Sequence, residues 1–167
     1  IDDPFRPMGM GSRSHDGEGL PVQETHLIDN GRLTSWLLNS SSARQLGMEP
    51  NGFSALGFGD PPGVTTSNLY LKAGDKTPGE LVKGAGKGLL VTDMFGPSIN
   101  PNNGDYSVGV SGFWFEAGEI AYPVSEVTIA GDLPSMFARL IPASDLEFRG
   151  TRDAPSILIE DMSLAGS

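Results

Sequence analysis

Two histidines and one pair of carboxylates are the residues whose types and spacing come closest to a catalytic or metal-binding pattern. Only Gly17 separates Asp16 from Glu18, so these carboxylates can share acid–base work or bind a hard cation together. In a glycine-rich turn, however, carboxylates more often accept hydrogen bonds from backbone N–H groups. His15 precedes this pair. His26 lies in an expected strand, where a lone histidine is usually a surface or core residue. The pattern favours structural roles for the carboxylates and for His26.

Several residue types that catalysis commonly needs are missing. The chain has no cysteine, which excludes disulfides, thiolate nucleophiles and cysteine-ligated zinc. Neither histidine begins a His-Glu-x-x-His zinc motif, and no Gly-x-Ser-x-Gly nucleophile turn occurs. We therefore predict no catalytic, cofactor-binding or metal-binding residue within this chain.

Glycine and asparagine patterns have structural explanations too. The run Gly84-x-Gly86-x-Gly88 follows an expected helix instead of preceding one, so it is more typical of a helix end than of a dinucleotide site. Four asparagines suggest a metal or glycan site, but in loops rich in glycine and proline they usually serve turn geometry. They are Asn68, Asn100, Asn102 and Asn103.

Composition narrows the class of protein. The 167 residues carry a net charge of −10, which argues against binding a nucleic-acid backbone. A 38% share of hydrophobic residues is enough for the core of one domain, and 23 glycines with 13 prolines indicate many turns and a β-rich fold. No apolar run approaches the roughly 20 residues of a membrane helix. We expect a cytoplasmic protein. Because the first residue is Ile1, we also expect a processed chain or part of a larger one.

The strand pattern predicts two hairpins. The first joins Val22–Ile28 to Leu33–Leu38 through Asp29-Asn30-Gly31, whose Asn-Gly step suits a type I′ turn. The second joins Tyr106–Phe115 to Ile120–Ile129. Pro123 cannot donate to a ladder, so we expect a bulge or a free edge there. Further strands are expected at Ser67–Lys72, Leu89–Thr92, Asp145–Phe148 and Ser156–Ile159, with a turn over Pro97–Asp105.

Capping signals predict three short helices. Ser40 or Ser41 is the expected cap of a helix over Asn39–Leu46, which Gly47 would close. A capping box, Thr77-Pro78-Gly79-Glu80, starts a helix over Pro78–Ala85, and Asp132 caps one over Leu133–Ile141. A loop with Phe53, Leu56 and Phe58 is expected over Pro50–Gly63. The predicted fold is α+β, a predominantly antiparallel β-sheet with two or three short helices, as a single domain over residues 1–167.

Many short runs of this sequence occur, in the same order, in one protein family. They include Asp2-Asp3-Pro4, Gly11-Ser12, Asp16-Gly17-Glu18-Gly19-Leu20-Pro21, Ile28-Asp29-Asn30-Gly31-Arg32-Leu33, Ala43-Arg44-Gln45-Leu46-Gly47, Ser67-Asn68-Leu69-Tyr70-Leu71, Gly88-Leu89-Leu90-Val91-Thr92 and Gly112-Phe113-Trp114-Phe115-Glu116. Over nearly its whole length the chain resembles the C-terminal domain of the TldD/PmbA family, once called modulators of DNA gyrase. The run Val127-Thr128-Ile129-Ala130-Gly131 and the ending Met162-Ser163-Leu164-Ala165-Gly166 resemble the PmbA/TldE branch.

The resemblance implies a function. In this family the TldD branch carries a His-Glu-x-x-x-His metal motif and a cysteine ligand, whereas the PmbA/TldE branch lacks the metal site. Together the two form a metallopeptidase that admits unstructured peptides, matures peptide antibiotics and degrades antitoxins. The expected role here is a non-catalytic component of such a heterodimer, with zinc on a TldD-like partner. The alternative is a homomeric peptide-binding or scaffolding protein without proteolytic activity. Neither role involves nucleic acid or a membrane.

Overall fold

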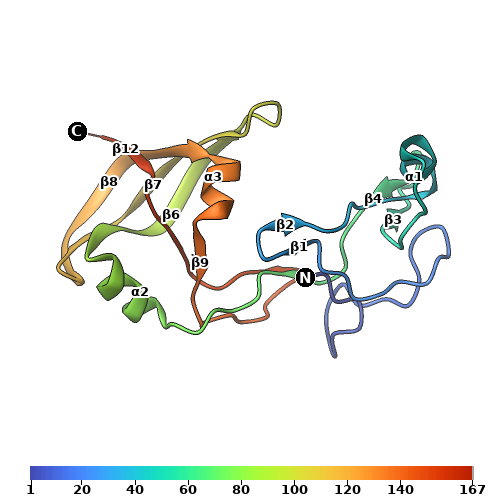
Figure 1. Ribbon diagram of the computed structural model, residues 1–167, viewed down its shortest axis with the longest axis horizontal. Helices are drawn as coiled ribbons and strands as arrows, with labels where there is room; N and C mark the ends of the chain where they lie inside the picture. The colour runs from blue at the N-terminus through green and yellow to red at the C-terminus, as the bar shows by residue number, and fades with distance from the viewer. Residues whose placement is uncertain (167) are drawn as a thin grey trace. The chain divides into compact units, whose positions relative to one another are not determined.

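The chain folds into two compact units in the computed structural model, which describes residues 1–166 (Figure 1). Unit 1 comprises Ile1–Lys72 and Leu146–Ala154. Unit 2 comprises Ala73–Asp145 and the residues from Pro155 onward. Three helices and mostly antiparallel strands confirm the predicted α+β class. That residues 1–167 act as a single domain stays a prediction.

Unit 1 consists of loops, very short strands and one short helix, α1 (Ser40–Leu46). The hairpin at Asn30-Gly31 is confirmed, with φ values of 48° and 76°. Its ladder is far shorter than predicted, because only two residues of each arm pair. The strands are β1 (Ile28–Asp29), β2 (Arg32–Leu33), β3 (Ser54–Ala55), β4 (Gly63–Val64), β5 (Leu69–Tyr70) and β10 (Arg152–Asp153), and β10 pairs with β5 in parallel. The expected Pro50–Gly63 loop thus contains β3 and buries Phe53, which is 2% exposed.

Side-chain caps fix where the helices begin. Helix α1 (Ser40–Leu46) is capped by Asn39, not by Ser40 or Ser41 as predicted. The Asn39 side chain accepts a hydrogen bond from the Ser42 N–H, while the Ser42 hydroxyl accepts one from the Asn39 N–H. Helix α2 (Pro78–Ala85) has the predicted Thr77–Glu80 capping box and ends at Gly86, which has a positive φ. Gly47 ends α1 as predicted.

A four-stranded antiparallel sheet dominates unit 2. Its order is β12 (Ser163–Ala165), β8 (Glu119–Asp132), β7 (Asp105–Glu116) and β6 (Lys87–Ile99), and Figure 1 shows the long β6–β7–β8 meander. The predicted Leu89–Thr92 strand was too short. Pairing with β7 continues to Ile99, and register shifts in β6 accommodate the residues around Pro97. The turn is therefore shorter than Pro97–Asp105.

The chain around the third helix differs from its prediction. Helix α3 (Leu133–Ala138) starts at the predicted Asp132 cap but ends before Ile141, because Leu140–Pro142 forms β9, which pairs with β11 (Ile157–Ile159). The predicted Asp145–Phe148 strand is wrong. The Asp145 carboxylate there instead accepts hydrogen bonds from the Ser156 N–H and hydroxyl, at 2.9 and 2.7 Å.

Bulges in β8 flank Pro123, as its missing N–H predicts. Pro123 lies opposite Phe113, and the register shifts on both sides of this pair. Strand β12 pairs with β8 only from Thr128 to Ala130. Both irregularities therefore lie where β8 has no ladder partner on its outer side among residues 1–166.

Close backbone packing in the sheet generates a stability prediction. A Cβ on Gly112 would lie 2.0 Å from the Leu90 carbonyl oxygen, a backbone atom held in the ladder. Gly112→Ala should lower the free energy of unfolding by on the order of 2 kcal/mol. The control is Gly79→Ala in α2, where a Cβ has open space. It should be neutral or raise stability by up to about 1 kcal/mol. Urea unfolding of both variants measures this, and equal effects would contradict the packing argument.

Candidate functional site

The Asp16 carboxylate is occupied by backbone donors. One oxygen accepts hydrogen bonds from the N–H groups of Glu18 and Leu20, both at 2.9 Å, and the other accepts one from Ser54 at 3.0 Å. Asp16 is only 8% exposed. Three N–H groups on two carboxylate oxygens close the 16–20 turn and tie it to β3. The structural interpretation of this residue agrees with its geometry.

Glu18 and the two histidines lie apart from any shared site. The Glu18 carboxylate accepts a hydrogen bond from the Ser40 N–H at the start of α1, at 2.9 Å. His15 is exposed, and its Nδ1 lies 3.0 Å from the Ser14 hydroxyl. His26 lies just before β1, with its Nε2 3.7 Å from a Glu24 oxygen. Within residues 1–166 no three His, Cys, Asp or Glu side chains gather closely enough to hold a metal ion.

Asn68 has a larger role than its predicted turn geometry. It is fully buried, its carbonyl oxygen accepts a hydrogen bond from the Gly11 N–H at 2.9 Å, and its NH₂ donates to the Asp3 carbonyl and the Ser12 hydroxyl. Two segments of the N-terminal loop, at Asp3 and at Gly11–Ser12, therefore meet on one side chain. The available signal was a polar amide inside the predicted Ser67–Lys72 strand.

Asp2 is a buried polar residue that no site motif in the sequence singled out. It is 1% exposed, and one of its oxygens accepts a hydrogen bond from the Ser67 N–H at 2.7 Å. Burial raises the pKa of this carboxyl above its ordinary value of 3.8, although the Ser67 bond opposes the shift. The position of Asp2 follows from its backbone pairing with Thr25, a contact that no local pattern reveals.

A cation–π cluster joins the two chain segments of unit 1, Ile1–Lys72 and Leu146–Ala154. The Arg6 guanidinium lies 4.4 Å from the centre of the Phe148 ring and 3.2 Å from an Asp153 oxygen, and the Tyr70 ring meets Phe148 edge-on. Hydrogen bonds from the Arg149 and Gly150 N–H groups, together with Arg6, lower the pKa of Asp153. These contacts position β10 against β5 and make the cluster structural.

The remaining predicted positions have mixed outcomes. Asn100, Asn102 and Asn103 lie at the β6–β7 turn, where the side chains of Asn100 and Asn103 accept backbone N–H bonds, as turn geometry predicts. Gly84 lies inside α2, and Gly88 lies in β6, where the Phe115 ring covers it. Of the three glycines, Gly86 is the one that ends the helix.

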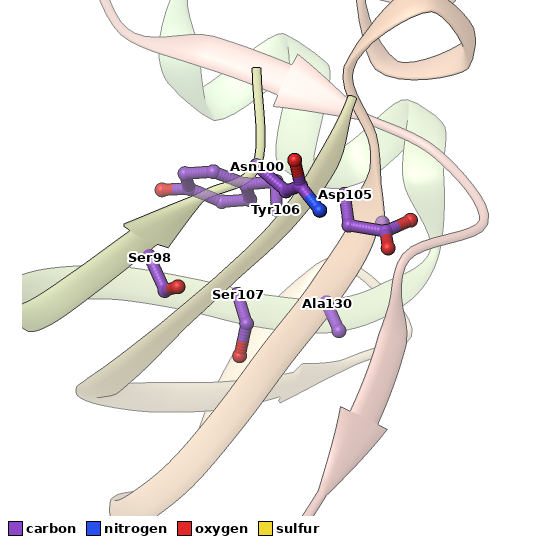
Figure 2. A pocket seen from close by; sticks show the side chains of 7 residues that line it. Ser98, Asn100, Asp105, Tyr106, Ser107 and Ala130 are labelled. Atoms are coloured by element: carbon purple, nitrogen blue, oxygen red, sulfur yellow. The ribbon is translucent and has the colours of Figure 1, made fainter. Parts of the chain in front are cut away.

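An open hollow of about 410 Å³ lies on the sheet of unit 2, near the β6–β7 turn. Figure 2 shows the small side chains of Ser98, Ser107 and Ala130, which come from three adjacent strands, with Asn100 and Asp105 at one end. These small residues are paired across the ladder, which explains the depression. The hollow offers polar contacts without any buried charged group, so it suits binding more than proton transfer.

The fold is that of a C-terminal domain of the PmbA/TldD metallopeptidase class. Residues 1–166 match the family described as the PmbA/TldA metallopeptidase C-terminal domain, and the chain belongs to this family. The resemblance in the sequence is thereby confirmed.

Three relatives illustrate the match. The Metalloprotease PmbA of Escherichia coli O157:H7 is 37% identical, and the PmbA homolog of Haemophilus influenzae is 39% identical, each over 95% of this chain. A crystal structure from Thermotoga maritima, named as a modulator of a DNA gyrase, superposes with a TM-score of 0.86 at 33% identity over 98% of this chain. The chain spans 33%, 34% and 38% of these proteins, respectively. None of the helices in residues 1–166 is long and apolar enough to cross a membrane.

The Asn68 contacts predict a large effect of an isosteric change. Asn68→Asp keeps the acceptor for Gly11 but removes both donors and buries a charge, so it should cost roughly 3 kcal/mol or more of unfolding free energy. Asn102→Asp, at an exposed turn position, is the matched control and should cost less than about 0.5 kcal/mol. Chemical denaturation of both variants measures the difference, and similar midpoints would show that Asn68 is not needed to hold the loop.

The buried Asp2 predicts a pH effect. Because its folded pKa is raised, its stabilising contribution is complete below the ordinary pKa and is lost as pH rises through the folded value. Asp2→Asn keeps an acceptor for the Ser67 N–H, but its side chain does not ionise. The variant therefore does not lose stability in this way as the pH rises. The free energy of unfolding of Asp2→Asn, relative to wild type, should therefore increase between about pH 3 and pH 7. A difference that is constant with pH would contradict a raised pKa.

Proposed function

We propose that this chain is part of a PmbA/TldE-like subunit that acts beside a metal-bearing TldD-like partner in a cytoplasmic metallopeptidase for unstructured peptides. The observation that carries the proposal is the match to proteins named Metalloprotease PmbA along 95% of the chain. Family membership supports a protease-related role. Beyond family membership, we propose that this chain belongs to a non-catalytic subunit and that its partner carries the zinc.

The local geometry is consistent with a supporting role. Asp16 and Glu18, the best candidates for acid–base chemistry, hold backbone N–H groups of β3 and α1. A carboxylate with its oxygens occupied in this way fixes a loop and is poorly placed to take a proton from a substrate. The part of this chain best suited to contact a peptide is the solvent-exposed face of the sheet in unit 2.

The proposal predicts which partner the protein binds and which preparation cleaves peptides. Native mass spectrometry of the full-length protein, purified from its own cells, should show a complex with a larger, zinc-bearing chain. An unstructured peptide should be hydrolysed by the complex and not by the protein alone. A chelator should abolish that hydrolysis.

Two other results would overturn the proposal. Zinc-dependent cleavage by the purified protein alone would make it the catalytic component. A metal-free assembly of this protein alone, with no partner recovered, would favour the alternative of a homomeric peptide-binding scaffold. A variant of the partner with its metal-binding histidines replaced is the control, because it should assemble and fail to cleave.

A further inference from the structure

One face of the unit 2 sheet is open to solvent and partly apolar. The register places three apolar residues in a row across it, Leu90 on β6, Phe113 on β7 and Pro123 on β8. Leu90 and Phe113 are each 39% exposed. A second row contains Phe95, which lies opposite Gly109. We call this surface, between the Leu90 row and the Ser98–Ser107–Ala130 hollow, the Phe95 face.

Phe95 is held in place while its ring remains available. A Cβ on Gly109 would lie 2.3 Å from a Phe95 ring atom, so the ring sits directly over the glycine. Phe95 is nevertheless 53% exposed. An aromatic ring fixed on a sheet and open to solvent offers a flat apolar contact at little entropic cost.

The charged side chains on the strands that form this face are mostly acidic. Between Gly88 and Asp132 the sequence has six acidic residues and no lysine or arginine. Asp93, opposite Ser111, lies between the Leu90 row and Phe95, and Asp105 and Asp132 lie at the end with the hollow. Hydrogen bonds from the Ser135 hydroxyl and N–H lower the pKa of Asp132, which therefore stays ionised at neutral pH. An occupant of this face meets apolar rows and negative charge together.

We propose that the Phe95 face docks an extended peptide segment in which lysine or arginine residues alternate with large apolar ones. The apolar side chains pack on Phe95 and on the Leu90–Phe113 row, and a cationic side chain lies between them near Asp93. Charge complementarity selects this occupant over an acidic segment, and a cation beside Phe95 gains a cation–π contact. This inference rests on the proposed role in peptide handling and adds a preference for basic peptides.

Matched peptides test the charge preference. Three labelled, unstructured peptides share the same apolar residues and carry Lys, Gln or Glu at the positions between them. Fluorescence anisotropy with the full-length protein should rank their affinities Lys above Gln above Glu, with about a tenfold span from Lys to Glu at low salt. The span should narrow in high salt because exposed charges are screened.

Two substitutions locate the binding surface. Asp93→Asn should weaken binding of the Lys peptide by roughly twofold to fivefold and leave the Gln peptide unchanged. Its effect on folding should be small, because the amide keeps an oxygen to accept from Thr92. Glu160→Gln, an exposed change of the same charge outside the sheet, is the control and should leave both affinities unchanged.

The outcomes separate this inference from the proposed function. Equal affinity for the Lys and Glu peptides would overturn the charge preference, whereas the metallopeptidase assignment would still be decided by partner recovery and cleavage. Loss of Lys-peptide binding equally in Asp93→Asn and Glu160→Gln would overturn the location on this face. A Lys preference that only Asp93→Asn reduces supports the inference, whichever partner is recovered.

Discussion

The satisfaction of buried polar groups is the constraint on which unit 1 depends. Its strands are two residues long, so ladders alone cannot hold its loops. Asp2, Asp16 and Asn68 are buried, and each accepts hydrogen bonds from backbone N–H groups of distant segments. Inside a protein an unpaired polar group is costly, so each of these contacts both stabilises and specifies one loop arrangement. Buried polar contacts therefore supplement the one short helix and the two-residue strands of this unit.

In unit 2 the backbone polar groups are paired mainly by the hydrogen-bond ladder of the β-sheet. Strands β6, β7 and β8 pair over most of their lengths, and the buried Val108 and Val110 lie on the face opposite Phe95. Glycines at positions 88, 109 and 112 let aromatic rings or backbone approach closely. The strands can therefore be long while one face keeps exposed rings. A regular frame of this kind presents a surface more rigidly than a loop does.

The sequence predicted best what a few neighbouring residues decide. The Thr77–Glu80 capping box, the Asn30-Gly31 turn and the Asp132 cap all follow from local side-chain chemistry, and all occur in the structure. Other contacts join residues far apart in sequence, which no local pattern encodes: the parallel β5–β10 pairing, the Arg6–Asp153 contact and the hydrogen bonds of the Asn68 side chain. Asn39 outcompeted the serines as a cap because its amide also donates to the Pro62 carbonyl, a contact from another segment. Several of the sequence runs that resemble the family contain the buried residues Asp2, Asp16 and Asn68. Since these residues hold the loops in place, the resemblance reflects a shared fold more directly than a shared catalytic chemistry.

The bulges decide how a peptide can meet the sheet. An edge strand can accept a further strand only where its outward N–H and C=O groups form a regular row. Strand β6 has register shifts near Thr92 and near Pro97, and the latter has no N–H to donate. Strand β8 is irregular around Pro123 and is paired with β12 from Thr128 to Ala130. Long strand addition is disfavoured on both sides. A peptide that binds through its side chains across the Phe95 face does not need a continuous strand edge. Such binding can also select the peptide by its charge, whereas hydrogen bonds to the main chain alone cannot.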